Sequence, residues 1–306
     1  MIDHVGSGHK MCEAIKRHTD HDIEIWTGPY HNRLVHPNQT NIITPRTRTK
    51  VQERINKSDI IHLKGDWPAV IYETKSIYAD FRLKIRHKPI IHTVSGSLFR
   101  RKIHGGFERF PLSDYQCTLR TSFEPDLLYP EWSDLWTPHP IDSDDKLIEW
   151  RNSRFPVLMH TPTNRSMKHT RFILNVFDAV RANRKVNIVL LEKLPFSFVL
   201  QERKKATIFF DQFKVGFYGN AAIEAMQYGI PTAAFISDMA RSQAKGKLNG
   251  CPVITTVKSV REWARLIIKI LDDDMNKLSL RTKKWCDQVH GYRSIAKQWD
   301  EIYKGI

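Results

Sequence analysis

Short apolar runs alternate along the chain with longer stretches in which apolar and polar residues are mixed. Short apolar runs are typical of strands buried in a sheet, whereas the mixed stretches are typical of amphipathic helices. The pattern predicts strands at 22–26, 59–63, 89–94, 155–160, 187–191, 207–211, 231–235 and 252–256. It predicts helices at 10–18, 46–57, 69–85, 170–181, 197–205, 220–228 and 259–271, with further helical segments after residue 281. This β–α series predicts an α/β protein with doubly wound parallel sheets.

The stretch 135–145, LWTPHPIDSDD, predicts a division of the chain. Pro138 and Pro140 flank a histidine there and acidic residues follow, which is typical of a linker or hinge. We therefore expect two Rossmann-like domains that face a cleft, followed by a C-terminal helix that packs back on the first domain. Ligands of such sheets bind at the carboxyl ends of strands beside helix N-termini. The expected ranges are 1–145, 146–290 and 291–306.

The loop after the predicted strand 155–160 carries two basic residues in the sequence TPTNRSMKHTRF. Arg165 and Lys168 lie directly before the predicted helix 170–181. A diphosphate needs cations that converge from one side, together with backbone N–H groups at a helix start, so this loop is a candidate phosphate site. Thr170 is the expected cap of the helix. The alternative is a basic loop that is only solvated.

The stretch 215–231, VGFYGNAAIEAMQYGIP, leads from another predicted strand into a short helix. Gly216 and Gly219 allow positive φ angles and a close approach of the backbone to a ligand. Glu224 falls in the first or second turn of the helix, where a carboxylate can accept two hydrogen bonds from a ribose diol. The alternative is a surface glutamate that stabilises the helix dipole.

Together, these two stretches resemble the nucleotide-sugar domain of GT-B glycosyltransferases, and most of all the family-4-like retaining enzymes. The resemblance is specific over 155–235 and diffuse over the first half of the chain. It implies that Arg165 and Lys168 bind the donor diphosphate and that Glu224 holds the ribose. It also implies that the first domain faces the acceptor and the second binds the nucleotide sugar. One departure is His169, which stands where the family has glycine.

A second departure concerns the first acid of the family's Glu-x7-Glu motif, whose position is Gly216 here. We expect Asp211, Gln212 or the backbone around Phe217 and Tyr218 to make the missing contact with the donor sugar. The further donor-binding candidates are Tyr218, Gly219, Asn220 and the loop of Gly6, Ser7 and Gly8, and the candidates to pack the base are Leu194, Pro195 and Phe196.

In the first domain, the segment 90–110 reads IIHTVSGSLFRRKIHGGFERF. The family has a histidine near the transferred sugar just before Gly-Ser, so the resemblance implies that His92 and Ser95 line the site as catalytic candidates. Basic and aromatic residues are interleaved over 99–110, which suits a nucleic-acid backbone with stacked or flipped bases and equally an anionic membrane face. The alternative is a solvated loop. The candidate acceptor-binding residues are Arg100, Arg101 and Lys102.

The charge of the chain bears on its partners. Its 306 residues include 48 Lys and Arg against 33 Asp and Glu, a net charge of +15, which favours nucleotide phosphates, nucleic acid or an anionic membrane surface. The sequence has no apolar run of about 18 residues and no signal core, so we expect a cytoplasmic protein, of the host cell if it is viral. The cysteines and histidines lack ligand spacing, and DSDD at 142–145 suits a helix cap, so we expect reduced thiols and no metal.

Three functions remain open. The first is a glycosyltransferase that acts on a hydroxymethylated base in DNA, as in phage-type DNA modification, and the charge favours it. The second is a glycosyltransferase that builds a cell-surface glycan or a lipid-linked saccharide. The third is a non-catalytic nucleic-acid-binding protein with a GT-B shell, which the intact set of Arg165, Lys168 and Glu224 disfavours.

The resemblance also implies the ligands. It implies a nucleotide-diphosphate sugar as donor substrate, with a UDP-sugar favoured over a GDP-sugar, and no prosthetic group. Duplex DNA is a candidate partner, and peripheral contact with a membrane stays open. The sequence predicts no oligomeric state.

Overall fold

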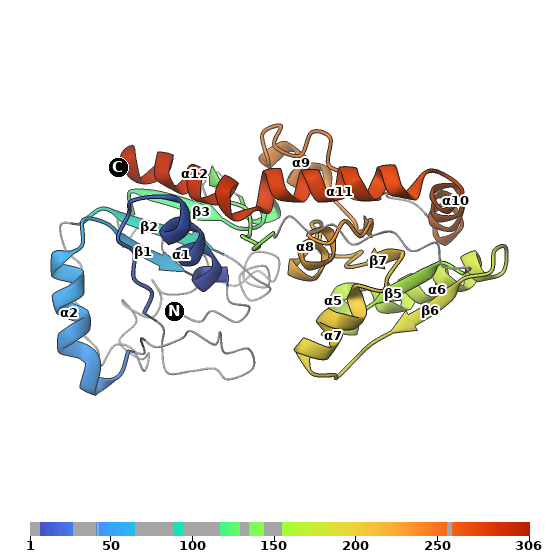
Figure 1. Cartoon of the computed structure of the whole chain (residues 1–306), viewed down its shortest axis with the longest axis horizontal. Coiled ribbons are helices and arrows are strands. Elements are labelled where there is room, and N and C mark those ends of the chain that lie inside the picture. The colour runs from blue at the N-terminus through green and yellow to red at the C-terminus, as the bar shows by residue number, and fades with distance from the viewer. Residues whose placement is uncertain are drawn as a thin grey trace. The chain divides into compact units, whose positions relative to one another are not determined.

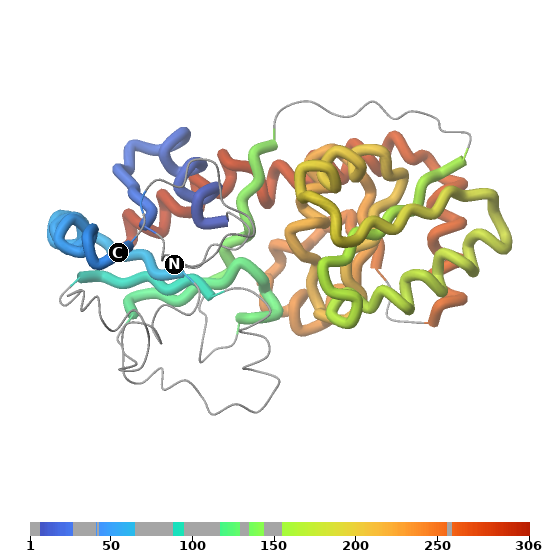
Figure 2. The backbone as a smooth tube through the Cα atoms, turned by 90° about the horizontal axis from the view of Figure 1, so that it is seen from below, coloured from blue at the N-terminus to red at the C-terminus, as the bar shows by residue number. Residues whose placement is uncertain are grey.

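The computed structural model describes residues 7–26, 41, 43–64, 88–94, 117–128, 135–143, 155–255 and 259–306. Contacts between residues divide the chain into two compact units. Unit 1 comprises Met1–Pro140 and Tyr292–Ile306, and unit 2 comprises Ile141–Gly291. The chain therefore passes between the units twice, once in the proline-containing stretch and once before the last helix (Figures 1 and 2). The predicted helix 69–85 lies outside the described residues.

Unit 1 contains a parallel four-stranded sheet in the order β1-β2-β3-β4. Parallel pairing in each of these strand pairs confirms the α/β prediction. The strands are β1 (Ile61–Lys64), β2 (Ile90–Val94), β3 (Leu119–Ser122) and β4 (Leu135–Trp136). The described helices of this unit are α1 (Ser7–His18), α2 (Arg48–Lys57) and α12 (Tyr292–Lys304), with 3-10 turns at Pro45–Thr47 and Pro125–Leu127.

The predicted strand at 22–26 is wrong, because residues 21–26 have no regular secondary structure. Ile23 and Ile25 are partly buried and pack against two different clusters of the unit 1 core. Their spacing therefore reflects side-chain packing, and no described strand supplies the ladder partner that a strand needs.

Helix α12 packs against α1 and completes the core of unit 1, and the two helices lie side by side in both views (Figures 1 and 2). Ile15 of α1, Ile91 of β2 and Trp299 of α12 are fully buried in one cluster. The C-terminal helix is thus part of the first unit. The other buried members of this cluster are Met11, Ala14, Phe123, Tyr292 and Ile295.

A chain of hydrogen bonds ties α12 to the sheet of unit 1. The Tyr303 hydroxyl lies 3.2 Å from Nδ1 of His62, whose Nε2 lies 2.6 Å from Oγ1 of Thr93. Oγ1 of Thr93 lies 2.7 Å from Oγ1 of Thr121. Burial, followed by the nearby His92, lowers the pKa of His62 to about 3, so this imidazole stays neutral at physiological pH.

Unit 2 contains a second parallel sheet, in the order β6-β5-β7-β8. Over the described residues 252–255, the strand predicted at 252–256 is a single bridge between Ala233 and Ile254. Pro252 has no N–H to donate to a ladder. The strands are β5 (Val157–His160), β6 (Asn187–Leu190), β7 (Ile208–Phe210) and β8 (Thr232–Ala233). The helices are α5 (Arg165–Lys168), α6 (Thr170–Arg181), α7 (Phe196–Arg203), α8 (Asn220–Met226), α9 (Asp238–Gln243), α10 (Val260–Leu271) and α11 (Met275–His290).

Helices cover both faces of the unit 2 sheet. Leu158, Ile208 and Phe210 pack into the cluster formed with α6 and α10. Met159 and Phe209 pack into a second cluster with α8. Consecutive residues of β5 and β7 thus enter two different apolar layers, which explains why these strands are continuous apolar runs in the sequence. Within the described ranges, no helix is long and apolar enough to span a membrane.

Candidate functional site

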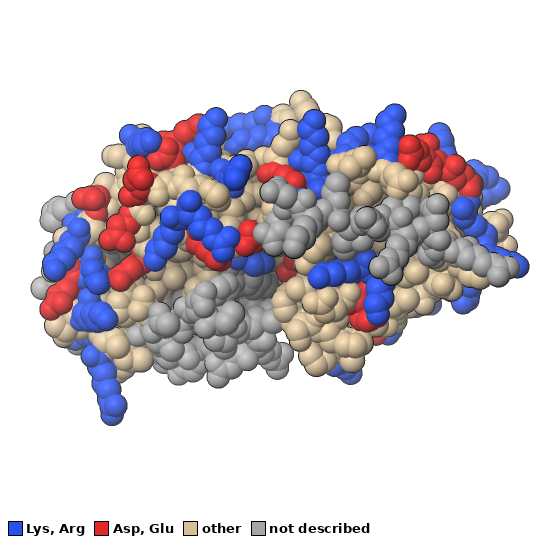
Figure 3. Space-filling model, in the orientation of Figure 1, with Lys and Arg blue, Asp and Glu red and all other residues tan. Residues whose placement is uncertain are grey.

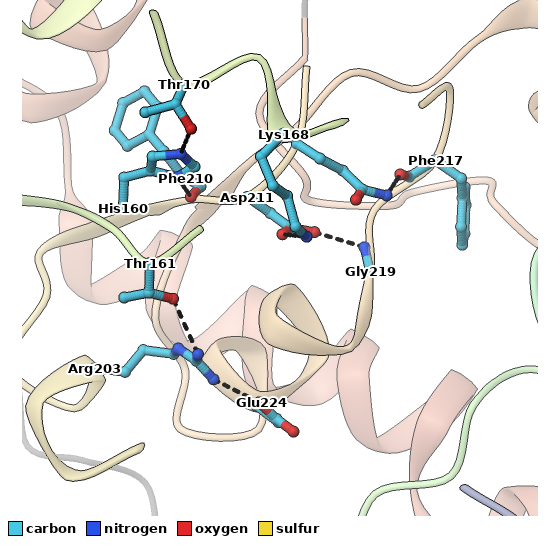
Figure 4. A network of polar contacts seen from close by, with 11 residues as sticks. His160, Thr161, Lys168, Thr170, Arg203, Phe210, Asp211, Phe217, Gly219 and Glu224 are labelled. Carbon is cyan, nitrogen blue, oxygen red and sulfur yellow. Dashed lines mark hydrogen bonds and ion pairs between the residues drawn. The ribbon is translucent and has the colours of Figure 1, made fainter. Parts of the chain in front are cut away.

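The loops at the carboxyl ends of β5 and β7 bring the polar candidates of unit 2 together (Figure 4). The two strands are neighbours, with His160 paired to Phe210 at their last positions. Because parallel strands end at the same edge of a sheet, the next residues, Thr161 and Asp211, leave that edge together. This edge is where a doubly wound sheet binds its ligands.

His160, the last residue of β5, connects β7 to the start of α6 through its imidazole ring. Its Nδ1 lies 2.8 Å from the carbonyl oxygen of Phe210 and its Nε2 lies 3.0 Å from Oγ1 of Thr170. Burial lowers the pKa of His160 to about 4, so the ring is neutral, with Nδ1 donating to the carbonyl and Nε2 accepting from the hydroxyl. Thr170 therefore bonds His160 and does not cap α6 as predicted.

His169 links α5 to α6 with a left-handed backbone. Its φ of 58° and ψ of 40° are the left-handed conformation that glycine adopts most readily, and glycine stands at this position in the family that the stretch resembles. The imidazole stacks on the ring of Phe172, with centroids 5.0 Å apart. We infer that this stacking offsets part of the strain of a non-glycine residue at positive φ.

Lys168, Asp211 and Gly219 form one cluster at the edge (Figure 4). The Lys168 ammonium donates to Oδ1 of Asp211, and the N–H of Gly219 donates to Oδ2 at 2.5 Å. The Asp211 side chain is 1% exposed and that of Lys168 is 14% exposed. A Cβ at residue 219 would lie 3.4 Å from both Nζ of Lys168 and Oδ2 of Asp211, which is ordinary van der Waals contact.

Gln212 and Ser237 hold the loop that precedes α8. Nε2 of Gln212 donates to the carbonyl oxygen of Phe217. The carbonyl oxygen of Gly216 accepts from the N–H of Ser237 at 2.9 Å and from its hydroxyl at 3.2 Å. Gly216 has a φ of 88°, and a Cβ there would meet Oγ of Ser237 at 3.1 Å. A glutamate at this position would be strained, which accounts for the missing acid in physical terms.

Glu224 lies in a buried ion pair with Arg203, the last residue of α7 (Figure 4). Nη1 of Arg203 donates to Oε2 of Glu224 at 2.5 Å, and Nη2 donates to Oγ1 of Thr161 at 3.1 Å. Glu224 is 7% exposed and Arg203 is 3% exposed, so Glu224 is not the surface glutamate of the alternative interpretation. In the sequence, Arg203 belongs to the basic run ERKKA at 202–206, and only its buried place on α7 distinguishes it from its neighbours.

Helix α5 directs its two basic residues to opposite neighbours of β5. Lys168 reaches Asp211 after β7, whereas Arg165 donates to both carboxylate oxygens of Glu192 after β6. The Arg165 side chain is 61% exposed. The hydrogen bonds between Arg165 and Glu192 lower the pKa of the carboxyl and raise that of the guanidinium. The expected convergence of the two cations is therefore not seen, because each faces its own carboxylate.

The other donor-binding candidates of unit 2 differ in what they can offer a ligand. The Tyr218 side chain is buried, and its hydroxyl lies 2.9 Å from Nε2 of His290 at the end of α11. Its side chain thus packs inside the unit, and a donor contact from this residue stays a prediction. Asn220 is half-buried and begins α8, whose start at Gly219 has no side-chain cap.

The first-unit candidates are only partly described. Ser7 and Gly8 begin α1 and are buried, and His92 is buried in β2. The predicted site residues that lie outside the described residues are Gly6, Ser95, Arg100, Arg101 and Lys102. Across the described part of the chain, no group of three His, Cys, Asp or Glu side chains could hold a metal ion.

Comparisons with known proteins give matches at the level of structure. No protein-family model matches the sequence, and no curated protein matches it. An α-glucosyltransferase in complex with UDP-glucose and DNA containing an abasic site is 10% identical, covers 91% of this chain and 90% of its own, and has a TM-score of 0.62. Sucrose-phosphate synthase from Thermosynechococcus elongatus is 12% identical, and the match covers 97% of this chain and 92% of the synthase chain, with a TM-score of 0.61.

The protein HepE from Anabaena, in complex with UDP-glucose, is also similar. It is 12% identical, covers 87% of this chain and 85% of its own, and has a TM-score of 0.56. At such identities the likeness concerns the fold. The chain has the GT-B glycosyltransferase fold, with two Rossmann-like units, as the motifs of residues 155–235 predicted.

Proposed function

We propose that the protein is a glycosyltransferase that moves a sugar from a nucleotide-diphosphate sugar to an acceptor hydroxyl. The observation that carries this proposal is the edge of β5 and β7, where Lys168, the N–H of Gly219 and the buried Glu224 lie in one small region (Figure 4). Similar structures with this fold hold UDP-glucose, which supports a UDP-sugar as donor, with a GDP-sugar as the alternative.

The proposed roles follow from charge and exposure. Arg165 and Lys168 would take up the donor diphosphate and stabilise the charge that builds on it as it leaves. Both side chains are already held by carboxylates, so phosphate oxygens would compete with Glu192 and Asp211 for the same N–H groups. Glu224 would accept hydrogen bonds from the ribose.

The proposed chemistry needs little acid–base catalysis from the protein. In a retaining transfer, the acceptor hydroxyl attacks on the face that the diphosphate leaves, and the leaving phosphate takes the hydroxyl proton. This scheme needs no metal. His92 and Ser95 of the first domain are proposed to line the site near the transferred sugar. Leu194 and Phe196 follow β6 as exposed apolar side chains, which suits packing against the base.

As acceptor we propose a hydroxymethylated base in duplex DNA. Residues after position 140 carry 28 basic against 17 acidic side chains, which is +11 of the net charge of +15. The similarity to an α-glucosyltransferase bound to DNA also supports this acceptor. A basic face formed by α9, α11 and the turn after α9 adds to it (Figure 3). Its exposed members, none of which forms an ion pair with a described acid, are Arg241, Lys245, Lys277, Arg281 and Lys284.

The test is a mass-spectrometric scan of UDP- and GDP-sugars with the purified protein and duplex DNA, with and without hydroxymethylated bases. We expect one sugar to be added only to the hydroxymethylated duplex. If a donor is hydrolysed but no duplex is modified, the DNA acceptor is wrong and a glycan or lipid-linked acceptor takes its place. If no donor is consumed with any acceptor, the enzyme proposal fails and a nucleic-acid-binding protein with a GT-B shell remains.

A further inference from the structure

Arg203 is the most deeply buried cation at the edge of β5 and β7. Its guanidinium lies 4.9 Å from the centroid of the Phe209 ring and donates to Glu224 and Thr161. Nε of Arg203 is buried and has no hydrogen-bond partner among the described residues. One side chain thus joins the end of α7 to the end of β5 and to α8 (Figure 4).

Stability alone does not explain this arrangement. Removing two charges from water is so unfavourable that apolar residues of similar size are often at least as stabilising as a buried ion pair. Here the incomplete hydrogen bonding of Arg203 makes the pair less favourable still. A role in the placement of Glu224 does explain it, because a carboxylate on a flexible side chain needs a partner to keep one orientation.

The contacts of Glu224 are one-sided. Oε2 accepts from Arg203, whereas Oε1 has no hydrogen-bond partner among the described residues. Figure 4 shows this second oxygen turned away from the guanidinium.

We infer that Arg203 is a positioning residue, which orients the Glu224 carboxylate so that Oε1 accepts from a ribose hydroxyl and the site selects ribose over deoxyribose. This inference rests on the proposed function. The contact is the same in the ground state and in the transition state, so its loss raises KM for the donor and leaves kcat nearly unchanged. A purely structural role would affect stability without changing the preference for ribose over deoxyribose in the nucleotide.

The test is calorimetric binding of UDP and 2′,3′-dideoxy-UDP to the full chain, with GDP and its dideoxy form as a second pair. We expect the natural protein to prefer UDP by about ten- to hundredfold, the range for one hydrogen bond to a charged group. In Arg203→Gln and Glu224→Gln, UDP affinity falls towards that of the dideoxy compound, whose own affinity changes less than about threefold. Arg203→Lys keeps the positive charge but loses the forked guanidinium, so we expect its UDP affinity to lie between those of the natural protein and of Arg203→Gln.

The matched control is Lys205→Gln, which removes an exposed cation two residues further along and is expected to leave both affinities unchanged. If Arg203→Gln does not fold, the ratio measured in Arg203→Lys decides the question. A reduced melting temperature with an unchanged ratio overturns the positioning role. Equal binding of UDP and dideoxy-UDP by the natural protein overturns the ribose contact while donor turnover still supports the enzyme. No binding of either nucleotide and no turnover overturns the proposed function itself.

Discussion

Replacing Asp211 with asparagine tests what holds Lys168 and the Gly219 loop in place. Asparagine has the same shape, but it is uncharged and has a single acceptor oxygen. Asp211 accepts from two donors, the Lys168 ammonium and the Gly219 N–H. In Asp211→Asn one donor keeps its acceptor, and the other faces an NH₂ group that is itself a donor.

The expected loss follows from one hydrogen bond to a charged group, about 1.5–3 kcal/mol. For a unit of the size of Ile141–Gly291, this corresponds to a fall in melting temperature of about 3–12 °C. The matched control is Asp178→Asn, which removes an exposed acid paired with Arg181 on α6. We expect that change to stay within about 1 kcal/mol, because surface ion pairs contribute little.

Nucleotide binding gives the more informative readout. Both carboxylate oxygens of Asp211 are used inside the protein, so UDP and UDP-glucose should lose or gain affinity by the same factor in the variant. UDP should also raise the melting temperature of Asp211→Asn by more than that of the natural protein, because its phosphates replace the lost partner of Lys168. A loss of UDP-glucose affinity tenfold greater than the loss for UDP would refute this reasoning, because Asp211 would then be the acid that contacts the donor sugar.

Other substitutions test the remaining features. Arg165→Ala should lower donor turnover at least about tenfold and change stability little, because the pair of Arg165 with Glu192 is exposed. Unchanged steady-state kinetics would remove Arg165 from the diphosphate site. Because burial lowers the pKa of His160 to about 4, the unfolded chain takes up the proton first, and stability falls as pH drops from 6.5 to 4. His160→Gln should reduce this fall by about 2–3 kcal/mol in urea titrations at pH 7 and 4.5, and an equal pH dependence would contradict it. Trp299→Ala should destabilise unit 1 by about 3–5 kcal/mol, seen as faster hydrogen exchange there, while exchange in unit 2 stays unchanged.

Much of unit 2 could be predicted because its strands are buried on both faces and its helices are strongly amphipathic. The helices predicted at 170–181 and 259–271 match α6 and α10. The strand at 22–26 failed because an apolar spacing of two also occurs where side chains pack without a ladder. The apolar spacing in the sequence reports side-chain burial, whereas strand pairing becomes evident only in the structure.

The candidate site could be located from the sequence, but not its pairings. Glycine spacing and the basic loop indicated one edge of the sheet, and the structure brings Lys168 and Gly219 together there, on the carboxylate of Asp211. Both signals depend on short-range constraints. The partners of Lys168 and Glu224, in contrast, are 43 and 21 residues away, and such distances leave no local signal. Arg203 was missed for this reason, since its burial depends on Phe209 and Thr161, which only the folded sheet brings near.

The place of α12 has a consequence for how the chain is made. The partners of α12 in unit 1 precede the residues of unit 2, Ile141–Gly291, while α12 itself follows them. At about 5–20 residues per second, a ribosome needs on the order of 10–30 s to make those roughly 150 residues. Throughout that time Met11, Ile15 and Ile91 lack the cover of Trp299 and Ile295. Unit 2 can fold as soon as it is made, so in the cell the second unit should complete its fold before the first. Until α12 is made, a chaperone would bind the exposed apolar residues of α1 and β2.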